Sequence, residues 1–364
     1  RHAALRTSFP AVDGVPVAQV AAAPLAGLVI EAPDVAPVAA RDAEARRRAG
    51  AEADLPFDLQ RGPLARFRLL RFDDADHLLL VTMHHIVSDG WSMGLLVGEL
   101  AALYGAFSEQ RPSPLAPLPI QYGDFAVWQQ RWLADHIEAR ELAYWREQLA
   151  GVPALSSVPG DRPRPAVRGS RGGVARMVLD AALVDRVRDV GWRSAGATVF
   201  MSLMAGFVAL LSRYNQQQDI AIGTGMANRA RTETEGVVGL FVNTLVLRTD
   251  LTGAPTYTEL LRRVRRVMLD AYAHQDAPFE RVVEAVQPER SLGRTPLFQV
   301  MFAQQNLPVG ALELPGLEVT AVEPDEATAK FDLTVFLDDG LTDGAAGGLA
   351  ISVVYATDLF DPST

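Results

Sequence analysis

A run rich in proline and glycine is the feature that most limits how this chain can fold. It begins at Gly151-Val152-Pro153 and ends at Pro159-Gly160-Asp161-Arg162-Pro163-Arg164-Pro165. Because proline lacks an amide donor and fixes its own φ, this run excludes both a helix and a central strand. The 364 residues are enough for a core on each side of it. We therefore predict an N-terminal lobe over 1–155, a linker over 156–172 and a C-terminal lobe over 173–364.

Strands and helices are predicted to alternate in both halves, which indicates an α/β fold. In the first half, the apolar run His77–Met83 has the length of a strand. Apolar residues then recur at helical spacing over Met93–Phe107, with Ser92 as the candidate N-cap, and again over Tyr122–Leu149. In the second half we predict strands at Val174–Leu179, Asp219–Thr224, Leu240–Arg248, Phe298–Gln304, Leu317–Val322, Asp332–Leu337 and Leu349–Tyr355, and helices at Ala181–Val190, Val199–Tyr214, Tyr257–His274 and Glu280–Val286.

Composition removes several classes of function. A net charge of −10 argues against nucleic acid as a partner, because phosphates call for a basic surface. No apolar stretch reaches the roughly 18 residues of a membrane span, and no signal peptide is apparent. With no cysteine there is no thiolate nucleophile, Cys-based zinc site or disulfide. The only lysine, Lys330, follows Ala329, which excludes a Gly-Lys-Ser/Thr phosphate loop.

The polar segment His84–Gly90 joins the predicted strand to the predicted helix and is the first candidate site. A neutral imidazole at such a place can accept a proton near neutral pH, and Asp89 could orient it. Metal binding is disfavoured, because adjacent histidines on an extended chain point to opposite faces. From the residues alone, catalysis and a polar turn remain equal alternatives.

Three other segments contain candidate site residues. Gly90-Trp91-Ser92-Met93-Gly94 matches the serine-hydrolase elbow, with His136 or His274 available for a triad, but the preceding strand ends too early at Met83. In Ile222–Arg229 the third glycine of a dinucleotide motif is replaced by Asn228. Arg229 itself is either a surface residue or the partner of an interior carboxylate. His274 stands near a helix C-terminus, where it favours the helix dipole.

Taken together and in order, six segments resemble the condensation domains of nonribosomal peptide synthetases. They are Arg1–Thr7, Met83–Ser92, Tyr122–Trp128, Ile222–Arg229 together with Gly239–Thr244, His274–Glu280 and Arg294–Gln299. The chain departs from the family at Ala3, where Glu is usual, and at Gly225, where Pro is commoner. The family's first motif would precede Arg1 and its closing helix would follow Thr364. We therefore expect both ends to be trimmed.

The resemblance implies a fold like chloramphenicol acetyltransferase, with two lobes in a V and the histidine loop at their junction. It implies peptide-bond formation, in which the α-amine of an acceptor aminoacyl thioester attacks a donor aminoacyl or peptidyl thioester. Both substrates arrive on phosphopantetheine arms of upstream and downstream peptidyl carrier proteins, and an adjacent adenylation domain is a further partner. The domain itself is expected to bind no cofactor or metal, to be monomeric, and to lie in the bacterial cytoplasm.

The resemblance also implies roles for the residues of the loop. His85 would contact the attacking amine, as a general base or as a positioning group. His84 would pack or form hydrogen bonds, and Gly90 would present its backbone N–H to the reacting centre. Asp89 would hold the loop through an ion pair with Arg229 or, as a second choice, Arg6, because a lone buried carboxylate is costly.

Three rival interpretations remain. An epimerisation domain shares the fold and the histidine motif. A recruitment domain without catalysis also shares the fold, although such domains tend to lose the histidine that stands here as His85. A serine hydrolase would use Ser92. Within the condensation family, the residues after Asp89, the Tyr122–Trp128 segment and the Asp161–Pro165 run resemble the subclass that joins an L donor to an L acceptor.

Overall fold

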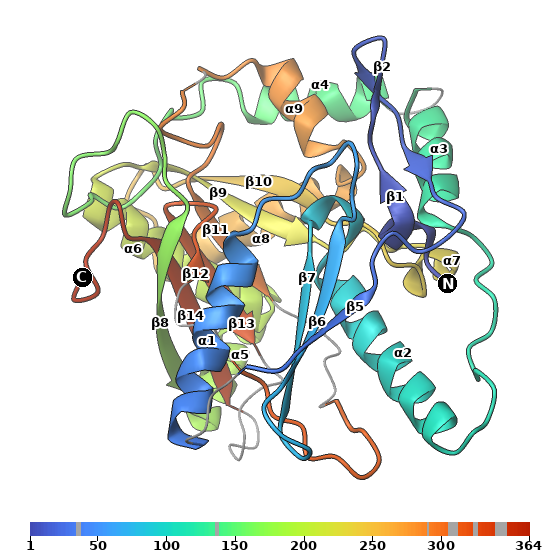
Figure 1. Ribbon diagram of the computed structural model, residues 1–364. Coiled ribbons are helices and arrows are strands. Elements are labelled where there is room, and N and C mark those ends of the chain that lie inside the picture. Colours follow the sequence, from blue (N-terminus) through green and yellow to red (C-terminus); the bar gives the residue numbers. More distant parts are fainter. Residues whose placement is uncertain (34–37, 135–137, 290, 305–311, 323–326, 339–347) are drawn as a thin grey trace. The chain divides into compact units, whose positions relative to one another are not determined.

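The computed structural model describes residues 1–364 except 34–37, 135–137, 290, 305–311, 323–326 and 339–347 (Figure 1). Contacts divide the chain into two compact units. Unit 1 contains Arg1–Arg131, Arg229–Phe241 and the described residues of Leu307–Asp325. Unit 2 contains the described residues of Trp132–Asn228, Val242–Asn306 and Glu326–Thr364.

These units differ from the predicted lobes over 1–155 and 173–364. The first boundary falls after Arg131, because the segment that follows places Leu142, Trp145 and Leu149 in the core of unit 2. Arg229–Phe241 belongs to unit 1, although it comes from the second half of the chain. Of the predicted linker 156–172, residues 156–170 contain no helix or strand, whereas Arg171 and Gly172 begin strand β8 (Arg171–Leu179). The predicted V arrangement of the lobes stays a prediction.

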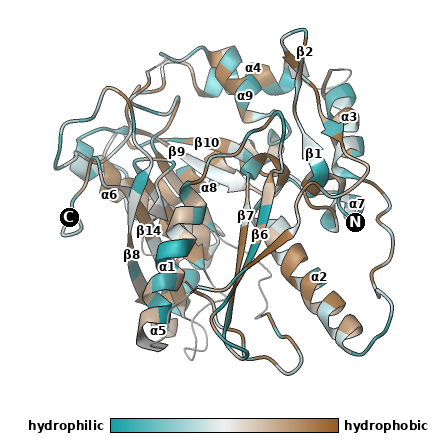
Figure 2. Ribbon diagram, viewed as in Figure 1, coloured by the Kyte–Doolittle hydropathy of each residue, from teal (hydrophilic) through white to brown (hydrophobic). Residues whose placement is uncertain are grey.

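Unit 1 is built from short strands and three long helices. Its elements are η1 (Ala3–Arg6), β1 (Thr7–Ser8), β2 (Ala11–Val12), β3 (Val15–Pro16), β4 (Gln19–Val20), β5 (Leu28–Glu31), α1 (Val38–Asp54), β6 (Ala65–Arg71), β7 (His77–Met83), η2 (His85–Val87), α2 (Gly90–Ser108), α3 (Tyr122–Trp132) and α7 (Thr232–Glu235). β6 lies between β5, to which it is parallel, and β7, to which it is antiparallel. Figure 2 shows the contrast between the apolar sequence of α2 and the polar sequence of α1.

The path from β7 to α2 positions the histidine loop. β7 ends where Met83 faces Ala65 of β6, and the amide of His84 then donates to the carbonyl of Leu64 at 2.9 Å. One 3₁₀ turn, η2, follows, and α2 starts at Gly90. The N-cap of α2 is Asp89, so the prediction of Ser92 as the cap is wrong. The helix starts at Gly90, three residues before Met93, where its apolar spacing begins.

Unit 2 has a seven-stranded mixed sheet in the order β10-β9-β11-β13-β14-β8-β12. Its elements are α4 (Glu138–Gln148), β8 (Arg171–Leu179), α5 (Ala181–Ala195), α6 (Val199–Asn215), β9 (Asp219–Met226), β10 (Asn243–Asp250), α8 (Tyr257–Ala273), α9 (Phe279–Val286), β11 (Val300–Gln304), β12 (Ala327–Thr328), β13 (Leu333–Asp338) and β14 (Leu349–Ala356). β11 is parallel to β9 and to β13, and the other pairs are antiparallel. Helices α4, α5, α6, α8 and α9 contribute to one core with this sheet.

The helical pattern over Tyr122–Leu149 contains α3 and α4. One predicted strand is corrected. The predicted strand Leu317–Val322 is wrong, because Leu317 makes only an isolated bridge with Leu314 and residues 318–322 have no regular structure. Leu317 and Val322 are exposed, so this apolar run has no sheet face to cover.

No single helix in the described parts of the chain is long and apolar enough to cross a membrane. Helices α5 and α6 together have the length and apolar composition of a span, but the pair is bent by 89°.

Candidate active site

His85 lies in the 3₁₀ turn that follows β7, and its side chain is exposed. Its Nδ1 is 2.7 Å from the carbonyl oxygen of Ser88. Because a carbonyl only accepts hydrogen bonds, the neutral ring carries its proton on Nδ1 and leaves a lone pair on Nε2. His85 is therefore held in the tautomer that can accept a proton or a hydrogen bond from an amine.

His84 has a different environment from its neighbour. Its Nδ1 accepts a hydrogen bond from the amide of Ile86 at 3.1 Å and so caps the 3₁₀ turn. Its ring packs edge-on against Phe57, with centroids 5.8 Å apart. His84 therefore both packs and forms a hydrogen bond, the two roles that were expected for it. Among the described residues, no three His, Asp or Glu side chains are grouped to hold a metal ion.

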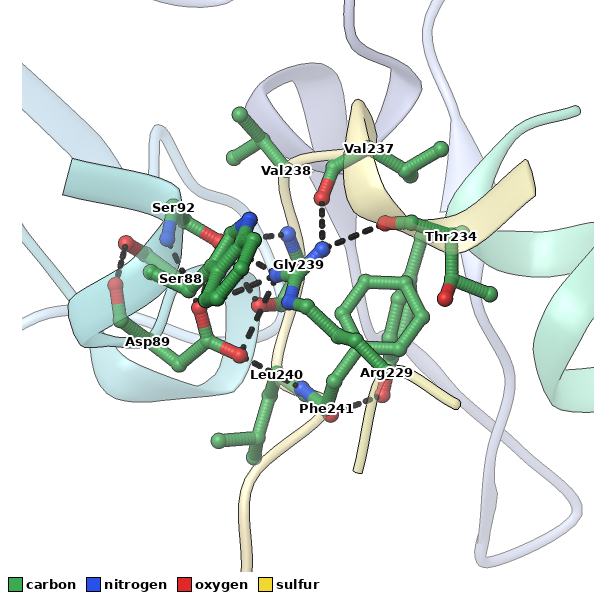
Figure 3. Close-up of polar contacts among 12 residues, drawn as sticks. Ser88, Asp89, Ser92, Arg229, Thr234, Val237, Val238, Gly239, Leu240 and Phe241 are labelled. Carbon is green, nitrogen blue, oxygen red and sulfur yellow. Dashed lines mark hydrogen bonds and ion pairs between the residues drawn. The ribbon is translucent and has the colours of Figure 1, made fainter. Parts of the chain in front are cut away.

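Asp89 is buried and serves as the N-cap of α2 (Figure 3). Its Oδ1 accepts from the Ser92 amide at 2.8 Å and from the Ser92 hydroxyl at 2.7 Å. Its Oδ2 accepts from the amide of Phe241 at 3.0 Å. The carboxylate thus fixes the end of the histidine loop to the start of α2 and to the 229–241 segment of unit 1.

The guanidinium of Arg229 is the charge partner of Asp89. Nη2 donates to Asp89 Oδ1 at 3.1 Å, and Nη1 donates to the carbonyls of Thr234 at 2.5 Å and Val237 at 2.7 Å. The group lies over the ring of Phe241, 4.0 Å from its centroid. Burial lowers the pKa of Arg229, and the neighbouring Asp89 opposes this shift. The predicted ion pair with Arg229 is therefore present.

The second predicted partner of Asp89 is engaged elsewhere. Arg6 donates through Nη1 to the carbonyl of Ala21. Gly90 is the first residue of α2 and is exposed, and its predicted backbone contact with a substrate stays a prediction.

The hydroxyl of Ser92 lies at the centre of this buried network. Its Oγ lies 2.7 Å from Asp89 Oδ1 and 3.0 Å from the Gly239 carbonyl, and it accepts from the Gly239 amide at 3.1 Å and from Arg229 at 3.1 Å. Ser92 is fully buried, and none of these partners is a histidine that could take its proton. The geometry therefore argues against Ser92 as a nucleophile.

Of the two histidines considered for a serine triad, the structure describes one. His136 lies outside the described residues. His274 belongs to unit 2, where its Nδ1 is 3.0 Å from Oε2 of the buried Glu141 and its ring stacks on Tyr144.

Ser92→Ala tests the structural interpretation of this hydroxyl. We expect a loss of about 1–3 kcal/mol in the free energy of unfolding, because the Gly239 amide and Arg229 lose an acceptor in a buried place. Urea unfolding measures it, with Ser108→Ala as the control, because Ser108 lies at the exposed end of the same helix. A fluorophosphonate is expected to label neither the original protein nor Ser92→Ala; labelling that depends on Ser92 contradicts this interpretation.

The sequence did not predict that the backbone amides and carbonyls of residues 238–241 would form hydrogen bonds in the site. The hydroxyl of Tyr122 donates to the carbonyl of Leu240 at 2.7 Å, and burial raises the pKa of Tyr122. A Cβ on Gly239 would overlap the Tyr122 ring, so this close approach requires glycine. The available signal was the glycine in Gly239–Thr244, but a pattern of side chains does not identify backbone partners.

The Condensation domain family model matches residues 1–364. The chain belongs to this family. This condensation domain is 46% identical over 364 residues to malpinin synthetase of Mortierella alpina, a match that covers 100% of the chain and 5% of that protein. It is 42% identical over 366 residues to chondramide synthase cmdD of Chondromyces crocatus, covering 100% of the chain and 9% of that protein. The chain thus spans a small fraction of these relatives.

Solved structures agree on the fold. The X-domain from teicoplanin biosynthesis matches with a TM-score of 0.87 and 33% identity, covering 100% of this condensation domain and 80% of that chain. The four-domain nonribosomal peptide synthetase holo-AB3403 matches with a TM-score of 0.80 and 23% identity, covering 99% of this chain and 28% of that one. The predicted α/β fold of the chloramphenicol acetyltransferase type is therefore confirmed.

Proposed function

We propose that this condensation domain joins a donor aminoacyl or peptidyl thioester to the α-amine of an acceptor aminoacyl thioester. The observation that carries the proposal is the fixed tautomer of His85, whose Nδ1 is 2.7 Å from the Ser88 carbonyl and whose Nε2 keeps its lone pair on an exposed side chain. Membership of the condensation family supports the same reaction.

In this reaction the amine nitrogen attacks the thioester carbonyl carbon. The new C–N bond forms, the C–S bond breaks, and the thiol of the donor arm leaves. Nε2 of His85 accepts a hydrogen bond from the amine and can take the proton that the nitrogen loses, which then passes to the leaving sulfur or to solvent. The Nδ1–H bond to Ser88 persists throughout, so the ring need not reorient when it becomes charged.

We propose that no metal or cofactor bound by the domain is needed, because a thioester is already activated toward amines. Phosphopantetheine arms of an upstream and a downstream carrier protein would deliver the two substrates, and an adenylation domain of the same synthetase would load the acceptor. Holding the two tethered reactants in the right orientation would raise the rate of the reaction in addition to proton transfer. We propose an L donor and an L acceptor, which the resemblance of the residues after Asp89 and of the Asp161–Pro165 run to that subclass supports, and we propose a bacterial synthetase as the source.

A product assay tests the proposed function. The intact synthetase is given a donor-loaded and an acceptor-loaded carrier protein, and the thioesters are released and separated by chiral chromatography. We expect a dipeptide on the acceptor carrier, formed faster with an L donor than with a D donor. An inverted monomer without dipeptide would indicate an epimerisation domain. Neither product, from carriers shown to be loaded, would favour recruitment without catalysis.

A further inference from the structure

Four consecutive residues of unit 1, Val238–Phe241, are each held by a different side chain (Figure 3 shows these four residues). The Gly239 amide and carbonyl bond Ser92, the Leu240 carbonyl accepts from Tyr122, and the Phe241 amide donates to Asp89. The first of the four, Val238, donates its amide to Nδ1 of His2 at 3.3 Å. We call these four residues the 238–241 ribbon.

His2 is the one member of this set that lies outside the loop, α2 and α3. It is 5% exposed and precedes η1. Its Nε2 is 2.9 Å from Oε2 of Glu99 on α2, while its Nδ1 faces the Val238 amide. The ring therefore connects the N-terminal segment, the middle of α2 and the start of the 238–241 ribbon.

These two neighbours fix the state of the His2 ring. A backbone amide only donates, so Nδ1 must carry a lone pair, and the proton of the neutral ring lies on Nε2 and is donated to Glu99. A doubly protonated ring would turn an N–H toward the N–H of Val238. Uptake of a second proton is therefore incompatible with the Val238 contact.

The surroundings of the His2 ring shift its pKa in opposite directions. Burial lowers the pKa of His2 more than the hydrogen bond and charge of Glu99 raise it. The charge of Arg1 adds to the lowering, while its side chain also pairs with Glu99 at 2.7 Å. Because the folded pKa lies below the ordinary value of about 6.5, the unfolded chain takes up the proton first as pH falls. The neutral His2 ring therefore makes its whole contribution to the free energy of unfolding above a pH of about 6.5. This contribution is lost as the pH falls through the folded pKa.

We propose that His2 is a positioning residue for the His85 loop, and that its neutral ring holds the 238–241 ribbon against α2 and releases it on protonation. The link to the loop is direct, because Phe241 at the other end of the ribbon donates to the carboxylate of Asp89, which lies between the 3₁₀ turn of His85 and the start of α2. The part concerning the reaction rests on the proposed function, whereas the part concerning the ribbon does not.

Two variants separate the acceptor at Nδ1 from the titrating ring. Asparagine places its amide oxygen near the position of Nδ1 and does not titrate, so His2→Asn is expected to hold Val238 at every pH. Leucine has no acceptor, so His2→Leu is expected to release it at every pH. Hydrogen exchange of the peptide that contains residues 238–241, measured in the intact synthetase and corrected for the intrinsic rate, reports the state of the ribbon.

Between about pH 8 and pH 5.5, on either side of the ordinary histidine value, we expect protection of this peptide to fall about tenfold in the original protein. In His2→Asn protection should stay constant, and in His2→Leu it should be low throughout. A peptide from β9 serves as the control, because that strand lies inside the sheet of unit 2. Equal pH dependence in the original protein and His2→Asn would overturn the proposal.

Activity gives the second readout. In His2→Leu at pH 8, kcat for condensation should fall about tenfold with little change in KM for the acceptor, and His2→Asn should recover most of it. If the exchange pattern appears but the original protein forms no dipeptide, the proposed function fails and the role of His2 in holding the ribbon stands. If the original protein forms dipeptide and both variants equal it, the positioning role fails alone.

Discussion

His85→Ala is expected to lower the rate of peptide-bond formation by about 10²–10⁴-fold, the usual contribution of a general base. The side chain is exposed and its Nδ1 bonds the carbonyl of Ser88, so its removal should leave the fold intact. Single-turnover transfer between two loaded carrier proteins measures the loss, with saturating acceptor. His77→Ala is the matched control, because His77 is an exposed histidine at the start of the same strand, β7.

A second substitution distinguishes the two roles proposed for His85, general base and positioning group. Glutamine presents an amide oxygen near the position of Nε2, so His85→Gln can accept a hydrogen bond from the amine but cannot take its proton. Activity close to that of His85→Ala would indicate proton transfer, and activity well above it would indicate positioning. Near-normal turnover in His85→Ala would refute both.

Arg229→Ala is expected to reduce the free energy of unfolding by about 3–5 kcal/mol, the cost of leaving a buried charge without its partner. Asp89 would keep its amide donors but lose its cation, and the carbonyls of Thr234 and Val237 would lose their donor. Urea unfolding of the isolated domain and of the intact synthetase measures the change. The rate of condensation should fall as well, because the carboxylate of Asp89 also caps the helix that follows the loop.

The controls for this prediction use the chemistry of the pair. Arg229→Lys should recover only part of the loss, since an ammonium has three donors on one atom and does not reproduce the planar fork. Arg193→Ala removes an exposed pair with Asp189, 3.2 Å apart, and should change the unfolding free energy by less than about 1 kcal/mol. If Arg193→Ala and Arg229→Ala have equal effects, the pair between Asp89 and Arg229 does not stabilise unit 1 as the contacts indicate.

Local patterns predicted most of the fold of unit 2. Apolar runs of strand length identified β9, β13 and β14, and helical spacing identified α8, each to within a few residues, because these elements contribute side chains to one core. The same reasoning failed at Leu317–Val322, where the apolar run has no partner strand.

The site was predictable only in part. The polar loop after β7 and the chemistry of His85 follow from local sequence. The pairing of Asp89 with Arg229 spans 140 residues and was inferred from the resemblance and from the cost of a lone buried carboxylate. The N-cap was assigned to Ser92 because its apolar neighbours begin at Met93, whereas Asp89 has the stronger geometry. The contacts of Ser92 and His2 involve backbone amides and carbonyls, which every residue possesses, so residue type carries no signal of them.

The return of Arg229–Phe241 to unit 1 has a consequence for synthesis on the ribosome. When Asp89 and Ser92 leave the exit tunnel, their cation and their backbone partners have not yet been made. At about 5–20 residues per second, the interval before Arg229 is translated is on the order of ten seconds. During that time the first 131 residues lack the segment that neutralises Asp89. The buried network around Asp89 therefore closes only after Trp132–Asn228, the first stretch of unit 2, has been translated, and a nascent chain stopped before residue 229 should be sensitive to protease around α2.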